Sequence, residues 1–203
     1  MNIDHWKIYE LEESILASGL PMRTKHDVCE FDADLAELNN AYFDFYTNKH
    51  TERLTKLADT PIGSGHANAL SGILVSVNIT ATVKWWEQFQ RYHFKQIVSS
   101  MSTMHRLRKM VLEGTIKFNE RTNPDIIKVF VRLAKDETVT DEELAYSCPM
   151  GIELTARITT NYLQLKTQYN QRKNHKLKEW HDYCSWIESL PLAKELIIGN
   201  KDE

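Results

Sequence analysis

The chain has 203 residues, 42% of them hydrophobic and 26% charged, which is enough for one globular domain, residues 1–203, with a sizeable core. The formal net charge of −3 gives no general attraction to nucleic acid or to an anionic membrane surface. No apolar run is long enough to cross a bilayer, and the N-terminal segment lacks the apolar stretch of a signal peptide. We therefore expect a cytoplasmic protein whose three widely spaced cysteines are reduced thiols.

The first part of the chain contains two patterned segments before a loop. Residues 6–17 carry several apolar positions, and their first half is compatible with a strand, before Gly19-Leu20-Pro21 ends the element. In residues 32–57, apolar side chains recur every three or four positions, which predicts a helix that Pro61 stops. The following segment, residues 61–69, is expected to be a loop.

Residues 73–82 give the clearest strand signal in the chain. Apolar and polar residues alternate strictly, with Ile73, Val75, Val77 and Ile79 on one face. The period then changes to that of a helix, which carries one aromatic face and one polar stripe. The aromatic face is Trp85, Phe89 and Tyr92, and the polar stripe is Lys84, Gln88, Arg91 and Lys95. We expect Gln88 and Arg91 to project together from one side of this helix.

The second half of the chain is predicted to be mainly helical. After Met104 the chain is expected to turn or to restart a helix. Helices are predicted over residues 125–135 and from a cap at Thr138 or Thr140 to the break at Cys148-Pro149-Met150-Gly151. A long helix is predicted over residues 152–177. Its apolar stripe is Leu154, Ile158, Tyr162, Leu165 and Tyr169, and its polar stripe is Arg157, Asn161, Gln164, Gln168 and Arg172. A last helix carries Trp180, Tyr183, Trp186 and Ile187 and ends before Pro191.

Three groups of residues are candidates for binding a ligand or a metal ion. The loop GSGHANA, which contains His66, follows a helix and precedes a strand, which is the reverse of the order around a dinucleotide-binding glycine loop. Histidines and cysteines show no pairs at metal-ligand spacing, so no metal site is predicted. Arginine suits a phosphate or carboxylate, and glutamine suits the edge of a pyrimidine, so Gln88 and Arg91 are candidate ligand-binding residues. A solvated helix face would explain the same residues.

The order and spacing of these features resemble the flavin-dependent thymidylate synthases. The matching features are Gly65-His66, the strand at 73–82, Gln88 with Arg91-Tyr92-His93, the loop Ser99–Arg106, and the segment from Cys148 to Arg172. The resemblance covers the chain from about residue 60 to 180. It implies an α+β fold, rich in helix around a central antiparallel sheet, and a homotetramer that binds FAD. It also implies methylation of the pyrimidine nucleotide dUMP with methylenetetrahydrofolate.

The resemblance also assigns roles to individual residues. Gln88, Ser102, Arg106 and Arg172 would contact the pyrimidine nucleotide, with Arg106 and Arg172 at its phosphate and Gln88 at the uracil edge. Residues His66, Arg91 and His93 would contact FAD. No catalytic side-chain nucleophile is implied, because reduced flavin would carry the redox chemistry.

The chain departs from the family pattern in several places. Tyr92-His93 replaces the end of an Arg-His-Arg motif, Gly72 stands where a second histidine is expected, and the Ser99–Arg106 loop has no acidic residue and is followed by Leu107 where a tyrosine is expected. The nucleotide residues are thus better kept than the flavin residues. This pattern fits a diverged pyrimidine-nucleotide-binding protein, or a non-catalytic interaction or regulatory protein on the same scaffold. Nucleic-acid binding through the basic segments 106–109 and 172–178 is disfavoured by the acidic net charge.

Overall fold

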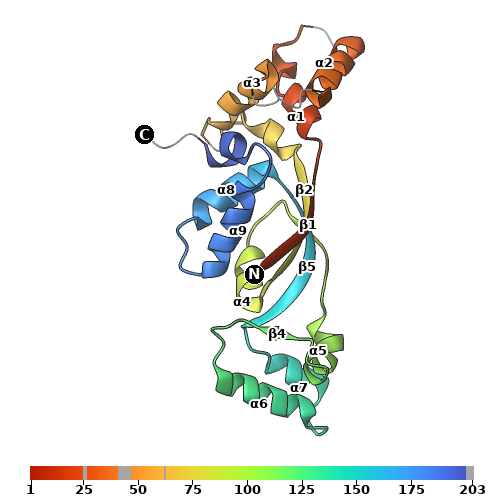
Figure 1. Ribbon diagram of the computed structural model, residues 1–203, viewed down its shortest axis with the longest axis vertical. Helices are drawn as coiled ribbons and strands as arrows, with labels where there is room; N and C mark the ends of the chain where they lie inside the picture. The colour runs from red at the N-terminus through yellow and green to blue at the C-terminus, as the bar shows by residue number, and fades with distance from the viewer. Residues whose placement is uncertain (25–26, 41–46, 62, 200–203) are drawn as a thin grey trace. The chain divides into compact units, whose positions relative to one another are not determined.

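The computed structural model of the chain describes residues 1–24, 27–40, 47–61 and 63–199 (Figure 1). These residues form two compact units. Unit 1 consists of Met1–His5 and Val77–Ile158, and unit 2 consists of Trp6–Ser76 and Thr159–Glu203. Strands β1, β2 and β5, defined below, contribute residues to both units, and the single domain inferred from the sequence stays a prediction. Among the described residues, no helix has both the length and the apolar character needed to cross a membrane.

A central sheet has the strand order β1-β2-β5-β3, and β4 pairs with β5 outside that path. The β4–β5 pair is antiparallel, with Lys117 opposite Glu153 and Phe118 opposite Ile152. The helix-rich α+β fold with a central antiparallel sheet is therefore confirmed. The strands are β1 (Asn2–Tyr9), β2 (Leu74–Thr82), β3 (Gln96–Ser100), β4 (Lys117–Phe118) and β5 (Ile152–Asn161).

The predicted strand at 73–82 is β2, and its alternation decides which side chains are buried. Val75, Val77 and Ile79 are fully buried, whereas Ser76, Asn78 and Thr80 on the other face are partly exposed. Helix α4 (Val83–Phe89) follows directly, because the Thr82 hydroxyl at the strand end accepts a hydrogen bond from the Trp85 amide at 3.1 Å. The strand thus passes into the helix without a loop.

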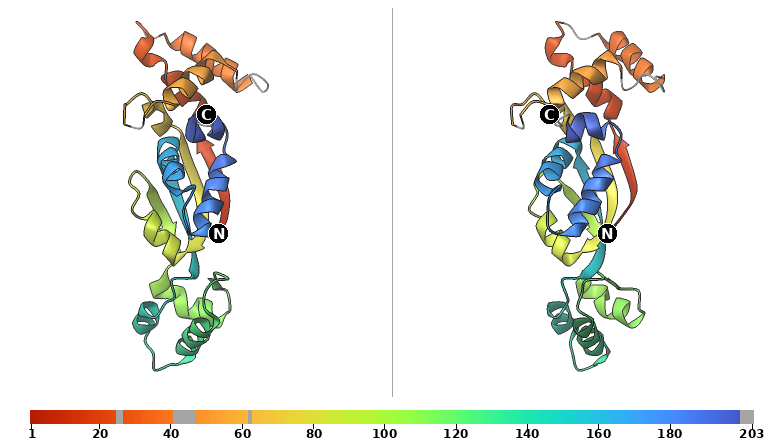
Figure 2. Two further views of the ribbon diagram at one scale, coloured as in Figure 1. Left: turned by 90° about the vertical axis from the view of Figure 1, so that its left-hand side faces the viewer. Right: turned by 60° about the vertical axis from the view of Figure 1, so that its left-hand side comes forward.

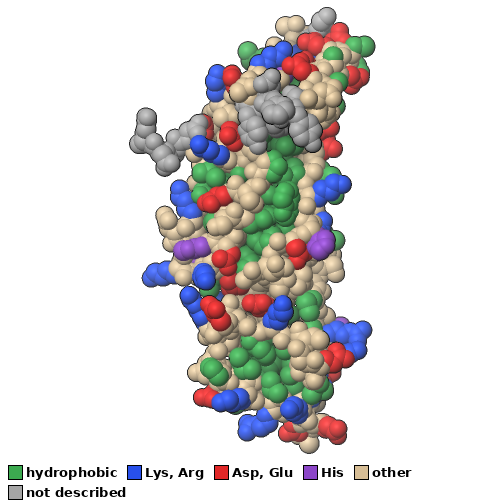
Figure 3. All heavy atoms as spheres, in the orientation of Figure 1, with side chains coloured by type: hydrophobic (Ala, Val, Ile, Leu, Met, Phe, Trp, Pro, Cys, Tyr) green, Lys and Arg blue, Asp and Glu red, His purple; other side chains and the backbone are tan. Residues whose placement is uncertain are grey.

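Unit 1 also contains a lobe of three helices, which we call the α5–α7 lobe. Its helices are α5 (Thr103–Leu112), α6 (Pro124–Lys135) and α7 (Asp141–Tyr146), which lie together in Figure 1. The lobe has its own apolar core, which includes Leu107, Phe130 and Leu144. Thr140 and Glu143 form the capping box that starts α7. The helices predicted at 125–135 and after Thr140 are confirmed as α6 and α7, and of the two alternatives left open after Met104 the chain forms a helix, α5. Ile126 and Val129 of α6 are exposed. Figure 3 shows hydrophobic side chains gathered on the surface of this lobe.

Unit 2 contains the remaining helices. Helices α8 and α9 lie side by side (Figure 2), and Trp180, Tyr183 and Ile187 of α9 are fully buried, as the predicted last helix requires. The helices are α1 (Leu11–Ala17), α2 (Val28–Asn40), α3 (Lys49–Ala58), α8 (Tyr162–Arg172) and α9 (Lys178–Glu188). Short 3₁₀ turns at Leu20–Met22 and Asn68–Ser71 and a π-helical turn at Lys194–Ile198 complete the unit.

Three helical expectations from the sequence are wrong in extent. The helix after β2 ends at Phe89, and residues 96–100 form β3, so Gln88 and Arg91 do not share a helical stripe. Residues 152–161 form strand β5 rather than the first half of a long helix. The predicted helix at 32–57 is interrupted at Asn48, whose backbone is extended and whose side chain caps the new helix α3; α2 covers Val28–Asn40 of the described residues. Tyr42, Phe45 and Tyr46 lie outside the described residues.

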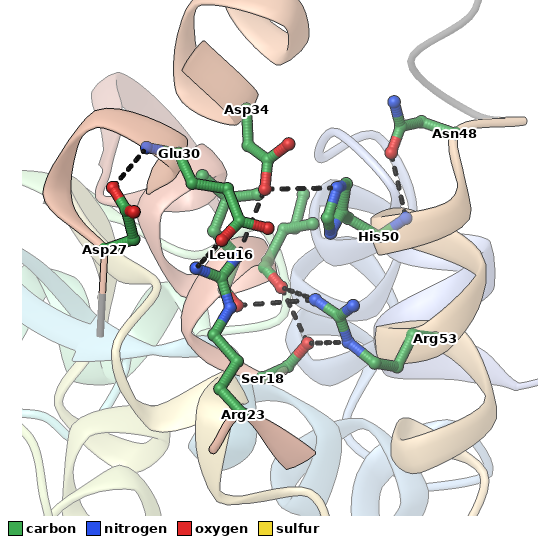
Figure 4. A network of polar contacts seen from close by, with 10 residues as sticks. Leu16, Ser18, Arg23, Asp27, Glu30, Asp34, Asn48, His50 and Arg53 are labelled. Atoms are coloured by element: carbon green, nitrogen blue, oxygen red, sulfur yellow. Dashed lines mark hydrogen bonds and ion pairs between the residues drawn. The ribbon is translucent and has the colours of Figure 1, made fainter. Parts of the chain in front are cut away.

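A buried polar network joins α1, α2 and α3 (Figure 4). Arg53 of α3 donates to the carbonyl oxygens of Ile15 and Leu16 at 3.1 and 3.3 Å, which satisfies the C-terminal end of α1. Arg23 donates to Asp34 at 3.1 Å, and the His50 ring lies 3.7 Å from the same carboxylate. His50 is only 5% exposed. Burial lowers the pKa of His50, although the nearby Asp34 carboxylate acts in the opposite direction.

We expect His50 to make the protein less stable in mild acid. Because the pKa of His50 is lower in the folded state than its usual value of about 6.5, the unfolded chain takes up more protons at this site as the pH falls below that value. The free energy of unfolding should therefore fall with pH in this range. Urea denaturation of the wild type and of His50→Gln at pH 7 and pH 5 measures the effect. An equal decrease in the free energy of unfolding from pH 7 to pH 5 in the two proteins would contradict this role of His50.

Candidate functional site

Two of the predicted nucleotide-binding residues lie together at the start of α5. Ser102 caps the helix by accepting a hydrogen bond from the His105 amide at 3.2 Å. Arg106 follows one helical turn later, and both residues line a groove of about 360 Å³. We call this groove the Arg106 groove. Its other lining residues are Met101, Lys109, Met110 and Glu113.

The Arg106 groove has the charge expected of an anion site. Arg106 is exposed, and within the described part of the chain its guanidinium makes no ion pair. Lys109 adds a second cation and lies 3.6 Å from the Glu113 carboxylate, which balances one of the two positive charges. Arginine can bind a phosphate through two parallel hydrogen bonds, and lysine adds a compact charge. The groove can therefore hold a phosphate or a carboxylate.

A second cavity lies in unit 1 between α4, β3 and β5. It has a volume of about 410 Å³, and we call it the Trp86 pocket. The Trp86 indole is held in place by a hydrogen bond to the Leu154 carbonyl at 3.0 Å and by the edges of Trp85 and Phe89. Met101 lines both this pocket and the Arg106 groove, so the two cavities adjoin.

The remaining predicted residues of unit 1 lie apart from the Arg106 groove. Gln88 is half-buried in the last turn of α4, and the Arg91 amide donates to its carbonyl at 3.3 Å. Arg91 and His93 are exposed in the connection between α4 and β3. Arg91 helps Lys84 to lower the pKa of Glu87, and the hydrogen bond from Lys84 is the main cause. The roles of Gln88, Arg91 and His93 stay predictions.

The last two predicted residues, His66 and Arg172, belong to unit 2. His66 is exposed in a turn that Gly65 makes with a φ of 82°, a conformation that favours glycine. Arg172 ends α8, and its guanidinium lies 4.6 Å from the centre of the Trp180 ring. Arg172 therefore already has a structural contact within its own unit. The proposed ligand roles of His66 and Arg172 stay predictions as well.

Comparisons with known proteins find solved structures with a similar fold but no significant sequence similarity. No family sequence model matches the chain, and no curated protein sequence is significantly similar to it. Solved structures do match. A crystal structure of Thymidylate Synthase X (ThyX) from Helicobacter pylori with FAD and dUMP has a TM-score of 0.69 at 16% identity, covering 97% of each chain. The chain has the ThyX fold.

A second solved structure gives the same result. It is flavin-dependent thymidylate synthase ThyX from Helicobacter pylori in complex with FAD and dUMP, with a TM-score of 0.62 at 13% identity. The match covers 97% of this chain and 98% of the other. The fold that the resemblance implied is thus confirmed over nearly the whole chain. At these identities the likeness concerns the ThyX fold alone.

The residues of this chain do not fit the FAD site that the resemblance implies. A side chain at Gly72 would place its Cβ 2.5 Å from the Ser14 hydroxyl of α1, so a histidine there would require the Ser14 side chain to move. Only Arg91 of the expected Arg-His-Arg motif is kept, and the segment Arg91-Tyr92-His93 lies beyond the end of α4. The residues that the resemblance assigns to FAD are therefore incomplete in the sequence, and the segment that keeps Arg91 lies outside the helix.

Several residues of these cavities were not assigned to a ligand site from the sequence. Lys109 was noted only as part of the basic segment 106–109, and its helical spacing of three from Arg106 was a signal that could have placed both cations on one face. Gln90, Met101 and Met150 of the Trp86 pocket come from separate segments, so no local pattern joins them. Cys148 is not an activated nucleophile, because burial raises its pKa to about 11 and keeps the thiol protonated.

Proposed function

We propose that this chain is a pyrimidine-nucleotide-binding protein on a ThyX fold, with the nucleotide phosphate in the Arg106 groove. One observation carries the proposal: Ser102 and Arg106, assigned to the nucleotide by motif resemblance, line one groove together with Lys109. The solved structures with this fold contain dUMP, which supports a ligand of the dUMP type.

The binding step follows from the chemistry of these side chains. The Arg106 guanidinium donates two hydrogen bonds to phosphate oxygens, Lys109 adds charge, and the Ser102 hydroxyl can contribute a third polar group. Arg172 is assigned to the same phosphate by resemblance, and Gln88 is assigned to the uracil edge. Assembly as a homotetramer and a cytoplasmic location remain part of the proposal, as does the exclusion of nucleic acid as the main partner.

The proposal stops at binding because the flavin residues are incomplete. In the flavin-dependent thymidylate synthases, FAD supplies the redox chemistry that turns a transferred methylene group into a methyl group. His66, Arg91 and His93 would contact FAD if it binds, but Gly72, which stands where the resemblance expects a second histidine, argues against the usual site. We therefore favour a nucleotide-binding or regulatory role over methylation of dUMP. After FAD is mixed with the purified chain and unbound FAD is removed by gel filtration, no flavin absorbance should stay with the protein. Flavin absorbance that co-elutes with the protein would favour the enzymatic function instead.

Removing the Arg106 guanidinium should weaken dUMP binding. The loss of a charged hydrogen bond costs about 2 kcal/mol, or roughly 30-fold in Kd. Isothermal titration calorimetry of dUMP into the wild type, Arg106→Ala and Arg172→Ala measures this loss. Arg121→Ala is the matched control, since Arg121 is an exposed arginine outside both cavities. Unchanged affinity in both Arg106→Ala and Arg172→Ala would refute the assignment of the phosphate site.

A further inference from the structure

The Trp86 pocket has the shape and lining of a site for a flat ring. Its volume of about 410 Å³ lies within the usual range for small-molecule sites. One wall is the Trp86 indole, and the others include Val83, Met150 and Leu154. Because the hydrogen bond from Trp86 to Leu154 and the contacts with Trp85 and Phe89 fix this indole, the wall is already formed without a ligand.

The Trp86 pocket and the Arg106 groove share one lining residue, Met101. Met101 stands between the two cavities and is held by Thr155 on β5, because the Met101 amide donates to the Thr155 carbonyl at 3.0 Å. The Thr155 amide in turn approaches the Met101 sulfur at 3.4 Å. A ligand that fills both cavities therefore has an apolar ring at one end and an anionic group at the other.

The polar groups that line the pocket come from α4 with its C-cap and from the strands β3 and β5. Glu87 and Gln90 line the α4 side and Ser100 and Thr155 the strand side, whereas Gln88 does not line the pocket. Successive helical residues are rotated by about 100°, so Gln88 points away from the face that carries Val83, Trp86 and Gln90. The Glu87 carboxylate is paired with Lys84 at 2.8 Å, and the Thr155 hydroxyl is hydrogen-bonded to that of Thr80 at 2.8 Å. Among these lining residues, Gln90 is the one whose side chain is an amide, with a donor beside an acceptor.

We propose that the Trp86 pocket takes the pyrimidine ring of the nucleotide whose phosphate lies in the Arg106 groove, with the Gln90 amide at the ring edge. This inference rests on the proposed nucleotide function and replaces Gln88 by Gln90 as the residue that contacts the base. A uracil ring presents an N–H donor beside carbonyl acceptors, and an amide side chain matches both. The flat ring stacks against the Trp86 indole.

The test compares two glutamines that lie two positions apart. We would titrate dUMP and inorganic phosphate separately into the full chain as wild type, Gln90→Ala and Gln88→Ala. Gln171→Ala serves as the matched control, because Gln171 is an exposed glutamine of unit 2 outside the described cavities. Gln90→Ala should weaken dUMP binding by about tenfold and leave phosphate binding unchanged, because phosphate occupies only the Arg106 groove. Gln171→Ala should match the wild type with both ligands.

A second measurement reports on the ring itself. Bound dUMP should quench tryptophan fluorescence in the wild type, and the quench should be lost in Trp86→Phe, which keeps an aromatic wall. Loss of dUMP affinity in Gln88→Ala with none in Gln90→Ala would overturn the ring position while leaving the nucleotide function standing. Wild-type affinity for dUMP in Gln90→Ala would do the same. If the wild type binds no dUMP at all, the proposed function itself fails.

Discussion

Trp85→Ala should destabilise unit 1 by about 3–5 kcal/mol, the usual cost of removing a large buried aromatic side chain. Trp85 is 0% exposed. Its ring stacks on Phe89 at a centroid distance of 4.7 Å and meets the edge of Trp86 at 4.9 Å. Truncation therefore leaves a cavity beneath α4 and removes the support of the indole that forms the wall of the Trp86 pocket. Urea denaturation followed by circular dichroism gives the loss directly.

The control for this prediction is another tryptophan. Trp6 on β1 is 42% exposed, so Trp6→Ala removes less buried surface and should cost well below the Trp85 value. The destabilisation by Trp85→Phe should lie between those of Trp6→Ala and Trp85→Ala, because a smaller ring can keep the stack on Phe89 but leaves part of the space empty. Equal destabilisation by Trp85→Ala and Trp6→Ala would show that the stack contributes little.

Arg108→Ala should destabilise the α5–α7 lobe by about 2–3 kcal/mol, since hydrogen bonds to charged groups are the stronger class and this side chain is partly exposed. The Arg108 guanidinium donates to the carbonyl oxygens of Ala134 at 2.8 Å and Asp136 at 3.3 Å, and also to that of Val139. It pairs with Asp141 at 2.6 Å. One side chain of α5 thus holds the end of α6 and the start of α7.

The planar guanidinium group of Arg108 reaches all of these acceptors. Arg108→Lys should therefore recover less than half of the stability that Arg108→Ala loses. Arg132→Ala, an exposed arginine on α6, is the matched control and should stay within about 0.5 kcal/mol of the wild type. Hydrogen exchange at residues 136–140 provides a local measurement, because these amides should exchange faster in Arg108→Ala. Full rescue by lysine would mean that charge alone, and not the planar guanidinium group, matters at this position.

The sequence determined the elements whose signals are local. The alternation in β2 follows from one buried and one partly exposed face, and the capping box of Thr140 and Glu143 fixes the start of α7. Both depend on neighbours within a few residues, so a pattern in the chain is sufficient. The motif resemblance placed Ser102 and Arg106 in one site, and the structure puts both on one groove.

Tertiary structure decided between helix and strand where the spacing of apolar residues is compatible with both. The apolar stripe through Leu154, Ile158 and Tyr162 has a spacing of four, which is a helical repeat but also an even step along a strand. Pairing of β5 with its neighbours in the sheet selects the strand. The mostly exposed segment Gln96–Ser100 likewise becomes β3 only because β5 supplies hydrogen-bonding partners.

Separation along the chain also explains which parts of the candidate site could be predicted from the sequence. Ser102, Arg106 and Lys109 follow one another on a single helix, so their proximity is a property of the sequence. The acceptors of Arg108 lie 26 to 33 residues away, and the Trp86 pocket joins α4, β3 and β5. Contacts between distant segments are set by how the chain packs around the sheet, and only the folded chain brings Gln90 and Met101 together in the Trp86 pocket.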